Sequence, residues 1–259
     1  QENHHLRDAH DHFLLAAQQQ HGPALHALGV IYLQGHGAPP DPAKSVYWLK
    51  RAIAHPQPDS YYNLAQLYES GRGTEVNLSR AFMLYHQAAK MGHAPSQYNI
   101  GLYYYQGRKA GSLVSINVPK PFASKHPETQ IIDDMVSRDP RQNAILSMAT
   151  AHYRNSDLNA PLQTLDIFVD EDHAQFTVQI IREMLPADTP NPNLSITPLG
   201  GNDPVQAGAW WTLAAEQKLP AAQQALALVN RVLTPEQVHL AKAIAKTEKA
   251  RMVSPSLKV

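Results

Sequence analysis

Apolar residues in the first part of the chain recur at steps of three and four, the spacing that places side chains on one face of a helix. Ala9, Phe13, Ala16 and Ala17 form the first such stripe and predict a helix over residues 8–20. Glycine and proline clusters interrupt the later stripes, and such clusters mark turns between elements. The pattern therefore predicts further helices over residues 24–34, 43–54, 60–70 and 78–91, one around residues 222–227, and a last one from residue 235 to about 251.

The same pattern returns after 36 residues. A shift of that length places Leu28 on Leu64 and Tyr32 on Tyr68, and it superimposes the glycines of the two turns. A period between 20 and 50 residues is typical of stacked repeat proteins. Each unit is expected to be a hairpin of a first helix, helix A, and a second helix, helix B. One hairpin cannot bury its own apolar face, so the hairpins must stack.

The predicted helix ends carry residues suited to capping. Asp41 precedes Pro42, which supplies an N-cap side chain followed by a proline at the first helical position. Gly35 follows the first helix A, where a left-handed residue commonly ends a helix. Thr234 and Gln237 have the spacing of a capping box at the start of the last helix.

The third repeat begins in frame and is then interrupted. Ile100, Tyr104 and Gly107 continue the pattern, but Lys109 stands where the second turn glycine is expected. The next acidic cap that the expected B-helix residues follow is Asp203. Ala207 and Trp210 stand at the same offsets from Asp203 as Ser45 and Trp48 do from Asp41. About 90 residues are therefore predicted to be inserted between helices A and B of this repeat.

The string Ala24, Leu28-Gly29, Tyr32, Gly35, Gly37, Asp41, Ser45, Trp48 and Ala52 resembles the Sel1-like repeat, a 36-residue relative of the tetratricopeptide repeat. The resemblance implies a mainly α protein, a right-handed α-solenoid whose concave face binds other proteins without catalysis. The expected organisation is a capping helix (1–23), repeats (24–108), an irregular or α+β insertion (109–202), a resumed repeat with C-terminal helices (203–252) and a tail (253–259).

One row of positions on the A helices is a candidate partner-binding surface. It lies nearly opposite the repeat's signature positions at 100° per residue. Aromatic and apolar side chains in the row suit binding, but they equally suit packing against a neighbouring helix or under the insertion. The row comprises His26, Val30, Leu33, Tyr62, Gln66, Glu69, Tyr98, Leu102 and Tyr105.

The insertion differs in kind from the repeats. Its pattern predicts strands over residues 114–118 and 164–169, helices over 127–137, 142–154 and 172–184, and a connecting loop over 186–202. Acidic residues outnumber basic ones there by eleven to seven, which favours contact with a basic partner. Asp170, Glu171 and Asp172 are its candidate binding residues.

Composition excludes several classes of function. Lys plus Arg equals Asp plus Glu at 22 each, so no overall charge attracts nucleic acid. No apolar run is long enough to cross a bilayer, and the absence of Cys removes thiol chemistry. No catalytic or cofactor-binding motif is found, so we expect neither an enzyme nor a cofactor. The alternative of another class is a small metal-dependent hydrolase or metal site in the insertion, near His173.

The sequence therefore predicts a scaffold or adaptor that binds a partner protein through the concave face and the insertion. The more specific alternative is an immunity or inhibitor protein that neutralises a secreted bacterial toxin or effector. The chain begins at Gln1 without a leader, which suits a periplasmic or otherwise exported protein, and a cytoplasmic one is the alternative. The partner and the oligomeric state are not predicted.

Overall fold

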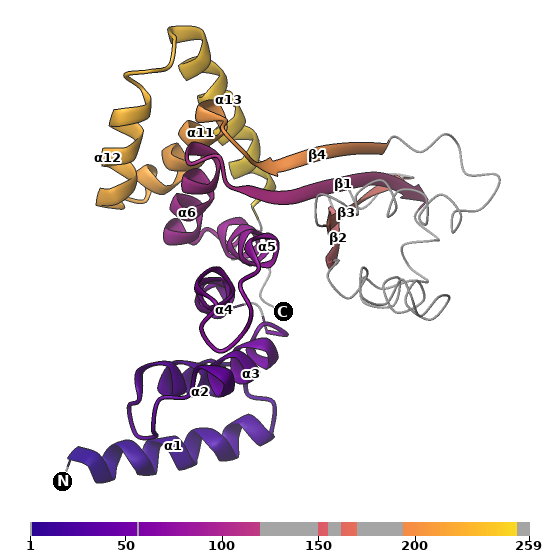
Figure 1. Ribbon diagram of the computed structural model, residues 1–259. Coiled ribbons are helices and arrows are strands. Elements are labelled where there is room, and N and C mark those ends of the chain that lie inside the picture. Colours follow the sequence, from indigo (N-terminus) through magenta and orange to yellow (C-terminus); the bar gives the residue numbers. More distant parts are fainter. Residues whose placement is uncertain (1, 56, 120–149, 155–161, 170–193, 253–259) are drawn as a thin grey trace. The chain divides into compact units, whose positions relative to one another are not determined.

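The computed structural model describes residues 2–55, 57–119, 150–154, 162–169 and 194–252 (Figure 1). The chain divides into two compact units. One comprises Gln1–Tyr105 with Asp203–Val259, and the other comprises Gln106–Asn202. The expected helices over residues 127–137 and 172–184, and the candidate residues Asp170, Glu171 and Asp172, lie outside the described residues.

The first unit is built of helices, and the mainly α prediction is confirmed. Helix A of repeats one to three is α2, α4 and α6, and their B helices are α3, α5 and α11. The first helix begins earlier than the expected residue 8. The helices are α1 (Glu2–Gln18), α2 (Gly22–Gln34), α3 (Pro42–Ala52), α4 (Pro58–Ser70), α5 (Leu78–Lys90), α6 (Ala94–Tyr105), α11 (Pro204–Glu216), α12 (Pro220–Val229) and α13 (Pro235–Arg251).

The predicted caps are confirmed. Asp41 accepts the Lys44 backbone N–H at 3.0 Å. Asn77, its counterpart in repeat two, was not predicted as a cap, and it accepts the Arg80 backbone N–H at 2.8 Å. Gly35 ends α2 in the left-handed conformation at φ 81°, which a side chain would strain. Thr234 and Gln237 form the reciprocal capping box of α13.

The core of this unit lies between successive hairpins. The signature side chains Leu28, Leu64 and Ile100 on the A helices are at most 1% exposed. Burying a side chain of this size stabilises a fold by about 1.5–3 kcal/mol. Small residues such as Ala52 and Ala88 on the B helices are also fully buried and let the helices approach closely.

Repeat three is completed across the insertion, as predicted. The backbone N–H of Asp203, the cap of α11, donates to the carbonyl of Tyr104 on α6 at 3.0 Å. The same bond joins Asp41 to Tyr32 in repeat one, at 2.8 Å, and Asn77 to Tyr68 in repeat two, at 2.9 Å. Figure 1 shows α6 and α11 lying side by side. The hairpin geometry is therefore kept although 97 residues, Gln106–Asn202, separate its helices.

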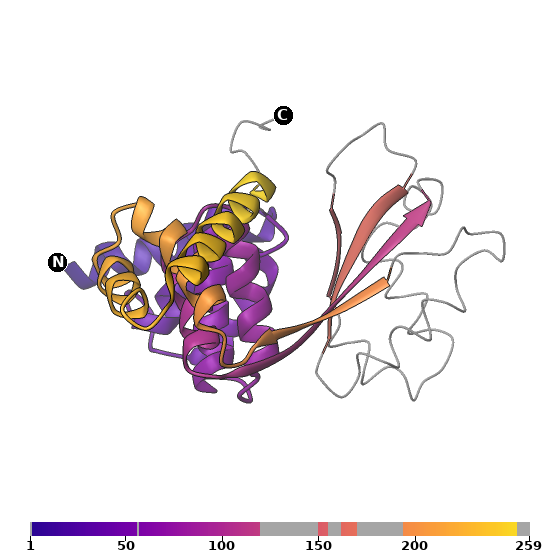
Figure 2. The ribbon, with the colours of Figure 1, turned by 90° about the horizontal axis from the view of Figure 1, so that it is seen from above.

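The second unit contains an antiparallel sheet in the order β2-β3-β1-β4 (Figure 2). The strands predicted over 114–118 and 164–169 are confirmed as parts of β1 and β3. In β1 the Cα of Val114 faces Ile167 of β3 on one side and Ile196 of β4 on the other. The strands are β1 (Lys109–Pro119), β2 (Thr150–Arg154), β3 (Leu162–Val169) and β4 (Leu194–Gly200).

Two predictions for this unit were wrong. Residues 150–154, taken as the end of a helix over 142–154, form β2, whose Tyr153 faces Leu165 of β3. Residues 194–200, taken as part of a loop over 186–202, form β4. Four prolines and two glycines in residues 186–202 suggested the loop. One of these prolines, Pro198, cannot donate to a ladder, but β4 lies at the edge of the sheet, where a proline is tolerated. In both cases pairing with a distant strand decides the structure.

Candidate functional site

Every residue of the predicted row on the A helices is at least partly accessible to solvent. Its residues on α2, α4 and α6 are half-buried, except Gln66 and Tyr105, which are exposed. Tyr105 keeps 46% of its surface accessible. The structure thus separates this row from the fully buried signature positions of the same helices.

The tyrosines of the row also pack on the B helix of their own repeat. The ring of Tyr62 lies 5.7 Å from that of Tyr85 on α5, and the rings of Tyr98 and Tyr105 lie 6.3 and 5.3 Å from Trp211 on α11. The packing alternative left open by the sequence therefore holds in part. Tyr62 and Tyr98 are half-buried, and Tyr105 stays exposed.

A second contact orders the row in repeat two. Tyr85 is fully buried, and its hydroxyl donates to Glu69 Oε2 at 2.7 Å. Burial raises the pKa of Tyr85 well above its usual range, and the bond to Glu69 acts in the same direction. The phenol therefore stays protonated and holds the Glu69 carboxylate at one end of the row.

Glycine in the Leu-Gly pair of the repeat makes room for the B helix. A Cβ on Gly29 would lie 2.6 Å from Leu49 Cγ, and a Cβ on Gly101 would overlap the indole ring of Trp211. Trp211 is 2% exposed, and its Nε1–H donates to the Tyr98 carbonyl at 3.1 Å. Gly101 thus lets Trp211 reach the backbone of the row and support two of its tyrosines.

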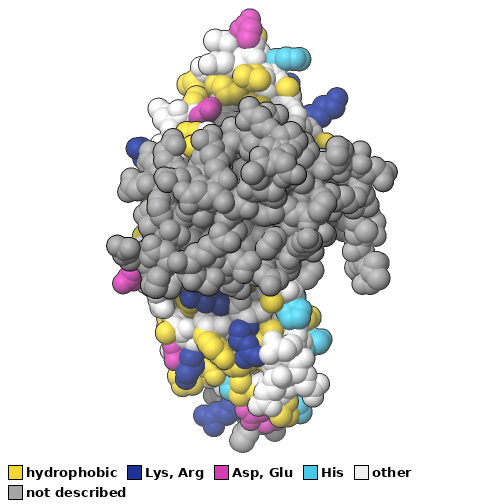
Figure 3. All heavy atoms as spheres, turned by 90° about the vertical axis from the view of Figure 1, so that its right-hand side faces the viewer, with side chains coloured by type: hydrophobic (Ala, Val, Ile, Leu, Met, Phe, Trp, Pro, Cys, Tyr) yellow, Lys and Arg dark blue, Asp and Glu magenta, His cyan; other side chains and the backbone are white. Residues whose placement is uncertain are grey.

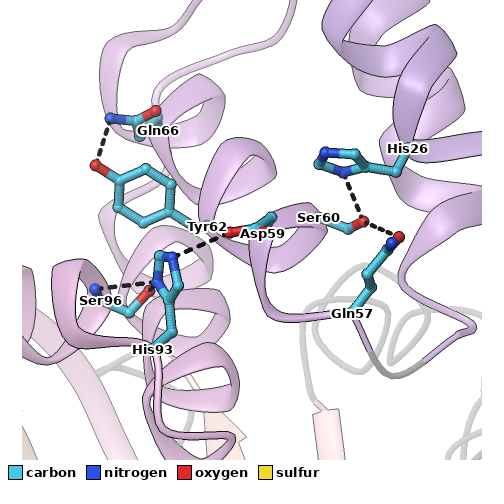
Figure 4. Close-up of polar contacts among 8 residues, drawn as sticks. All are labelled: His26, Gln57, Asp59, Ser60, Tyr62, Gln66, His93 and Ser96. Atoms are coloured by element: carbon cyan, nitrogen blue, oxygen red, sulfur yellow. Dashed lines mark hydrogen bonds and ion pairs between the residues drawn. The ribbon is translucent and has the colours of Figure 1, made fainter. Parts of the chain in front are cut away.

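Histidine links the A helices of repeats one and two (Figure 4). His26 Nδ1 lies 2.9 Å from Ser60 Oγ, and the same hydroxyl donates to Gln57 Oε1 at 3.3 Å. Burial lowers the pKa of His26, while the nearby charge of Asp59 opposes this shift. A row residue is therefore bonded across the joint between two repeats.

A second histidine links α4 to the start of α6. His93 Nε2 lies 3.2 Å from Asp59 Oδ1, and Nδ1 lies 2.8 Å from Ser96 Oγ. The rings of His93 and Tyr62 are 4.9 Å apart. Burial lowers the pKa of His93, and Asp59 opposes the shift by its charge and its hydrogen bond. Figure 4 shows His93 between Asp59 and Ser96, beside Tyr62.

Asp59, His93 and Ser96 have the residue types of a hydrolase triad, but their geometry is that of a helix start. Ser96 is 0% exposed, so its hydroxyl cannot reach a substrate. Its backbone N–H also donates to His93 Nδ1 at 3.3 Å, as a cap would require. A triad needs a nucleophile that faces a substrate site. The cluster is therefore structural.

The other chemistry considered from the sequence finds no support in the described part of the chain. Within it, no group of three or more His, Cys, Asp or Glu side chains is placed to hold a metal ion. Nor does any described helix combine the length and apolar character needed to cross a membrane. The acidic run at residues 170–172, with His173, lies outside the described residues.

The repeat frame and the exposure of Leu228 extend the row to α12. Leu228 on α12 follows Leu226-Ala227 as Val30 follows Leu28-Gly29, and 58% of its surface is exposed. A helix was predicted around residues 222–227, but the row was assigned only on the three repeats before it, so Leu228 was missed.

Basic side chains lie over the signature tyrosines, which the sequence did not predict. Lys44 Nζ lies 5.3 Å from the ring centroid of Tyr32, and Arg80 Cζ lies 5.6 Å from that of Tyr68. Lys50 approaches Tyr68 as well, at 5.7 Å. Figure 3 shows Lys and Arg side chains gathered among hydrophobic ones over the lower, N-terminal part of the helical unit. Such cation–π contacts hold the cations in place.

Comparison with known proteins agrees with the repeat frame. The sequence pattern of the Sel1 repeat family matches residues 22–55, 58–93, 94–116 and 199–219. Over 102 residues the chain is 35% identical to chitin synthase regulatory factor 2 of Schizosaccharomyces pombe, a match that covers 36% of this chain and 20% of that protein. The chain thus spans about a fifth of the length of this curated relative.

Two solved structures are similar to the chain. A Sel1 repeat protein from Oxalobacter formigenes is 30% identical, with 38% of this chain and 74% of that chain covered and a TM-score of 0.34. A protective antigen present in uropathogenic Escherichia coli strains, which displays an SLR fold, is 21% identical, with 95% and 52% covered and a TM-score of 0.36. With the family pattern matched on both sides of the insertion, this chain is a Sel1-like repeat protein.

Proposed function

We propose that this protein is a non-catalytic scaffold that binds a partner protein through the row on α2, α4 and α6, extended by Leu228, and through the insertion. Sel1 repeats are generally protein-binding scaffolds without catalysis. One observation carries the assignment to the row. Successive A helices keep the same three positions accessible, while the signature positions beside them are buried.

The tyrosine side chains of the row are held in place by packing, which favours binding. Tyr98 and Tyr105 rest against Trp211, and Tyr62 rests against Tyr85, so these rings are held before a partner arrives. A side chain that is already ordered loses less conformational entropy on binding, a cost of about 0.5–1.5 kcal/mol for each flexible side chain. Tyrosine also combines a large apolar surface with a polar tip, as interface residues often do.

Site-specific cross-linking tests the proposal. A photo-reactive amino acid would replace Tyr105 or Leu102 in the row, and Tyr47 on α3 as the control. Tyr47 is a matched control because 54% of its surface is exposed, against 46% for Tyr105. In an extract of the source cells, the same protein should cross-link at both row positions and not at residue 47.

Binding of the recovered partner would then be measured by calorimetry. Tyr105→Ala and Leu228→Asp should each weaken it about tenfold or more, because truncation of a hot-spot residue costs about 2 kcal/mol or more. Equal cross-linking at residue 47, or unchanged affinity in both variants, would refute a binding role for the row.

The identity of the partner is a separate proposal. The acidic insertion, unlike anything in the repeats, favours a dedicated partner such as a secreted toxin or effector that an immunity protein would neutralise, in a periplasmic or otherwise exported setting. Co-expression with the product of the neighbouring gene tests this directly. Growth rescued by the whole chain and not by a variant lacking the insertion would support it, whereas growth that is unaffected by this chain would dismiss it.

A further inference from the structure

A pocket of about 410 Å³ opens between α1 and the turn of repeat one. Arg7 and His10 of α1 line one side, Tyr32 of α2 and Lys44 of α3 line another, and residues 38–40 of the turn supply an apolar wall. This volume lies within the range of sites that bind small molecules or single side chains of a partner. The polar groups that converge in the pocket decide what it accepts.

Helix α1 occupies the place of a B helix before repeat one. The second turn glycine of repeat one, Gly37, packs against the carbonyl of Leu6, as Gly73 of repeat two packs against the carbonyl of Pro42. Leu6 is therefore the counterpart of Pro42, and the 36-residue frame makes His10 the counterpart of Val46.

The difference between His10 and Val46 is informative, because Val46 is an ordinary core residue at 5% exposure. An aliphatic side chain is therefore enough to stack one repeat on the next. At the first joint a histidine stands in its place and forms polar contacts: Nδ1 lies 3.1 Å from Asp11 Oδ1, and Nε2 lies 3.0 Å from the Tyr32 hydroxyl. Stacking does not require these contacts, but they fix the Tyr32 hydroxyl beside the pocket.

Both acidic groups of the pocket already have partners. Asp11 faces His10, while Asp41 caps α3 and lies 3.4 Å from Lys44 Nζ. The guanidinium of Arg7 has no ion-pair partner among the described residues. Its planar, two-pronged set of donors matches a carboxylate. Arg7 and Lys44, the latter shared with Asp41, thus offer N–H donors to an incoming anion, while the Tyr32 hydroxyl is engaged with His10 Nε2.

We infer that this pocket binds the carboxylate of an acidic side chain of a partner protein. Arg7 and Lys44 hold the charge, and Pro39 and Pro40 contact its methylene groups. The inference rests on the proposed function, because it treats the ligand as part of a bound protein. It adds a charge-specific contact on the signature side of α2, separate from the row.

Titration of the isotopically labelled whole chain, followed by NMR, tests the pocket. The probe is an N-acetylated, C-amidated Ala-Glu-Ala peptide, compared with its Ala-Gln-Ala counterpart and with inorganic phosphate. The Glu peptide should shift the backbone amides of Gly37, Ala38 and Lys44 in a saturable way, and the Gln peptide should not. Loss of one charge-assisted hydrogen bond in Arg7→Gln should weaken this binding about tenfold or more.

Matched variants separate the pocket from general charge effects. Arg80→Gln removes the counterpart of Lys44 in repeat two, and it should leave the titration unchanged. His10→Val introduces the residue of the equivalent joint, so it should keep the helical circular dichroism and leave binding nearly unchanged, because Arg7 and Lys44 are kept. Lys44→Gln should weaken it as Arg7→Gln does.

Three results would overturn the inference. The first is that the Gln peptide shifts the amides as much as the Glu peptide does. The second is that the Glu peptide causes no shift at high millimolar concentration. The third is that phosphate, but neither peptide, causes shifts, and that Arg7→Gln abolishes them. The last result would assign the pocket to phosphate. These outcomes are distinguishable from failure of the proposed function, because cross-linking at Tyr105 uses no pocket residue.

Discussion

The backbone N–H of Asp203 donates to the carbonyl of Tyr104 at 3.0 Å, although the two residues lie on either side of the whole insertion. At the base of the insertion, Gly201 N–H likewise donates to the Arg108 carbonyl at 2.9 Å. The two ends of the insertion therefore leave the helical unit from one place. The turn that they replace is the short turn of repeats one and two.

Replacement of residues 109–202 by Gly-Thr-Glu-Val, the residues that follow Gly71-Arg72 in repeat two, should therefore leave the helical unit folded. The helical circular dichroism should be retained with a cooperative thermal transition, because α6 and α11 keep their contacts. A matched variant with the same graft and Trp211→Ala should lose several kcal/mol, since large-to-alanine changes in a core cost about 3–5 kcal/mol. A molten shortened chain would mean that the insertion is needed for the hairpin.

Gly101→Ala should destabilise the protein by about 1–3 kcal/mol, because the added methyl group overlaps the Trp211 ring and a packed core resists extra volume. Repeat two has Ala65 and Tyr85 at the equivalent positions, so the double variant Gly101→Ala with Trp211→Tyr should recover part of the loss. Gly208→Ala is the control. Its nearest neighbours would lie at 3.5 Å, so helix propensity should instead stabilise it by about 1 kcal/mol. Urea midpoints measure all three.

Stability should fall as the pH is lowered through the range in which His26 and His93 titrate. Burial lowers the pKa of both from 6.5, so the unfolded chain binds protons at a higher pH than the folded one. The contribution of these neutral histidines is fully present above pH 6.5 and is lost as the pH falls through their lowered pKa values.

The His93→Gln variant checks this, since Gln57 stands at the same position of repeat two. Urea midpoints between about pH 5 and pH 8 should depend less on pH in the variant than in the parent chain. His239→Gln, at an exposed position, is the control and should follow the parent. An identical pH dependence in all three chains would contradict the assignment.

Removal of one cap tests how repeat three resumes after the insertion. Asp203 accepts the backbone N–H groups of Val205 and Gln206, both at 3.0 Å. Asp203→Ala should cost about 1 kcal/mol, as N-cap losses do, and Asp203→Asn should cost little because Asn77 caps α5 in the same way. Thermal unfolding distinguishes the two variants. Equal losses would show that charge rather than hydrogen bonding matters at this cap.

The helical unit was predictable because its signals are local and repeated. The Asp41 cap marks a helix start and Gly35 marks a helix end, and the alanines favour helix. Each assignment in repeat one can be checked against the same position of repeat two. The end of the insertion could be predicted for the same reason, because Asp203 is an N-cap followed by the residues expected at the start of a B helix. A single-copy element offers no such check.

The strands β2 and β4 were missed because their structure depends on partners far along the chain. Residues 150–154 carry a helix-compatible pattern, and only pairing with β3 makes them a strand. The pocket was missed for another reason: its chemistry is a departure from the repeat. His10 becomes informative only when the structure shows that it stands in the place of Val46.

The split of repeat three also sets an order of events during synthesis. Ile100 and Tyr103 on α6 are buried in the finished fold, and Trp211 on α11 belongs to the hairpin that α6 completes. The ribosome must first make Gln106–Asn202, 97 residues, which takes roughly 5–20 s at about 5–20 residues per second. For that interval the apolar face of α6 lacks the helix that completes its hairpin. The nascent chain is thus most open to chaperone capture or misassembly at its third repeat.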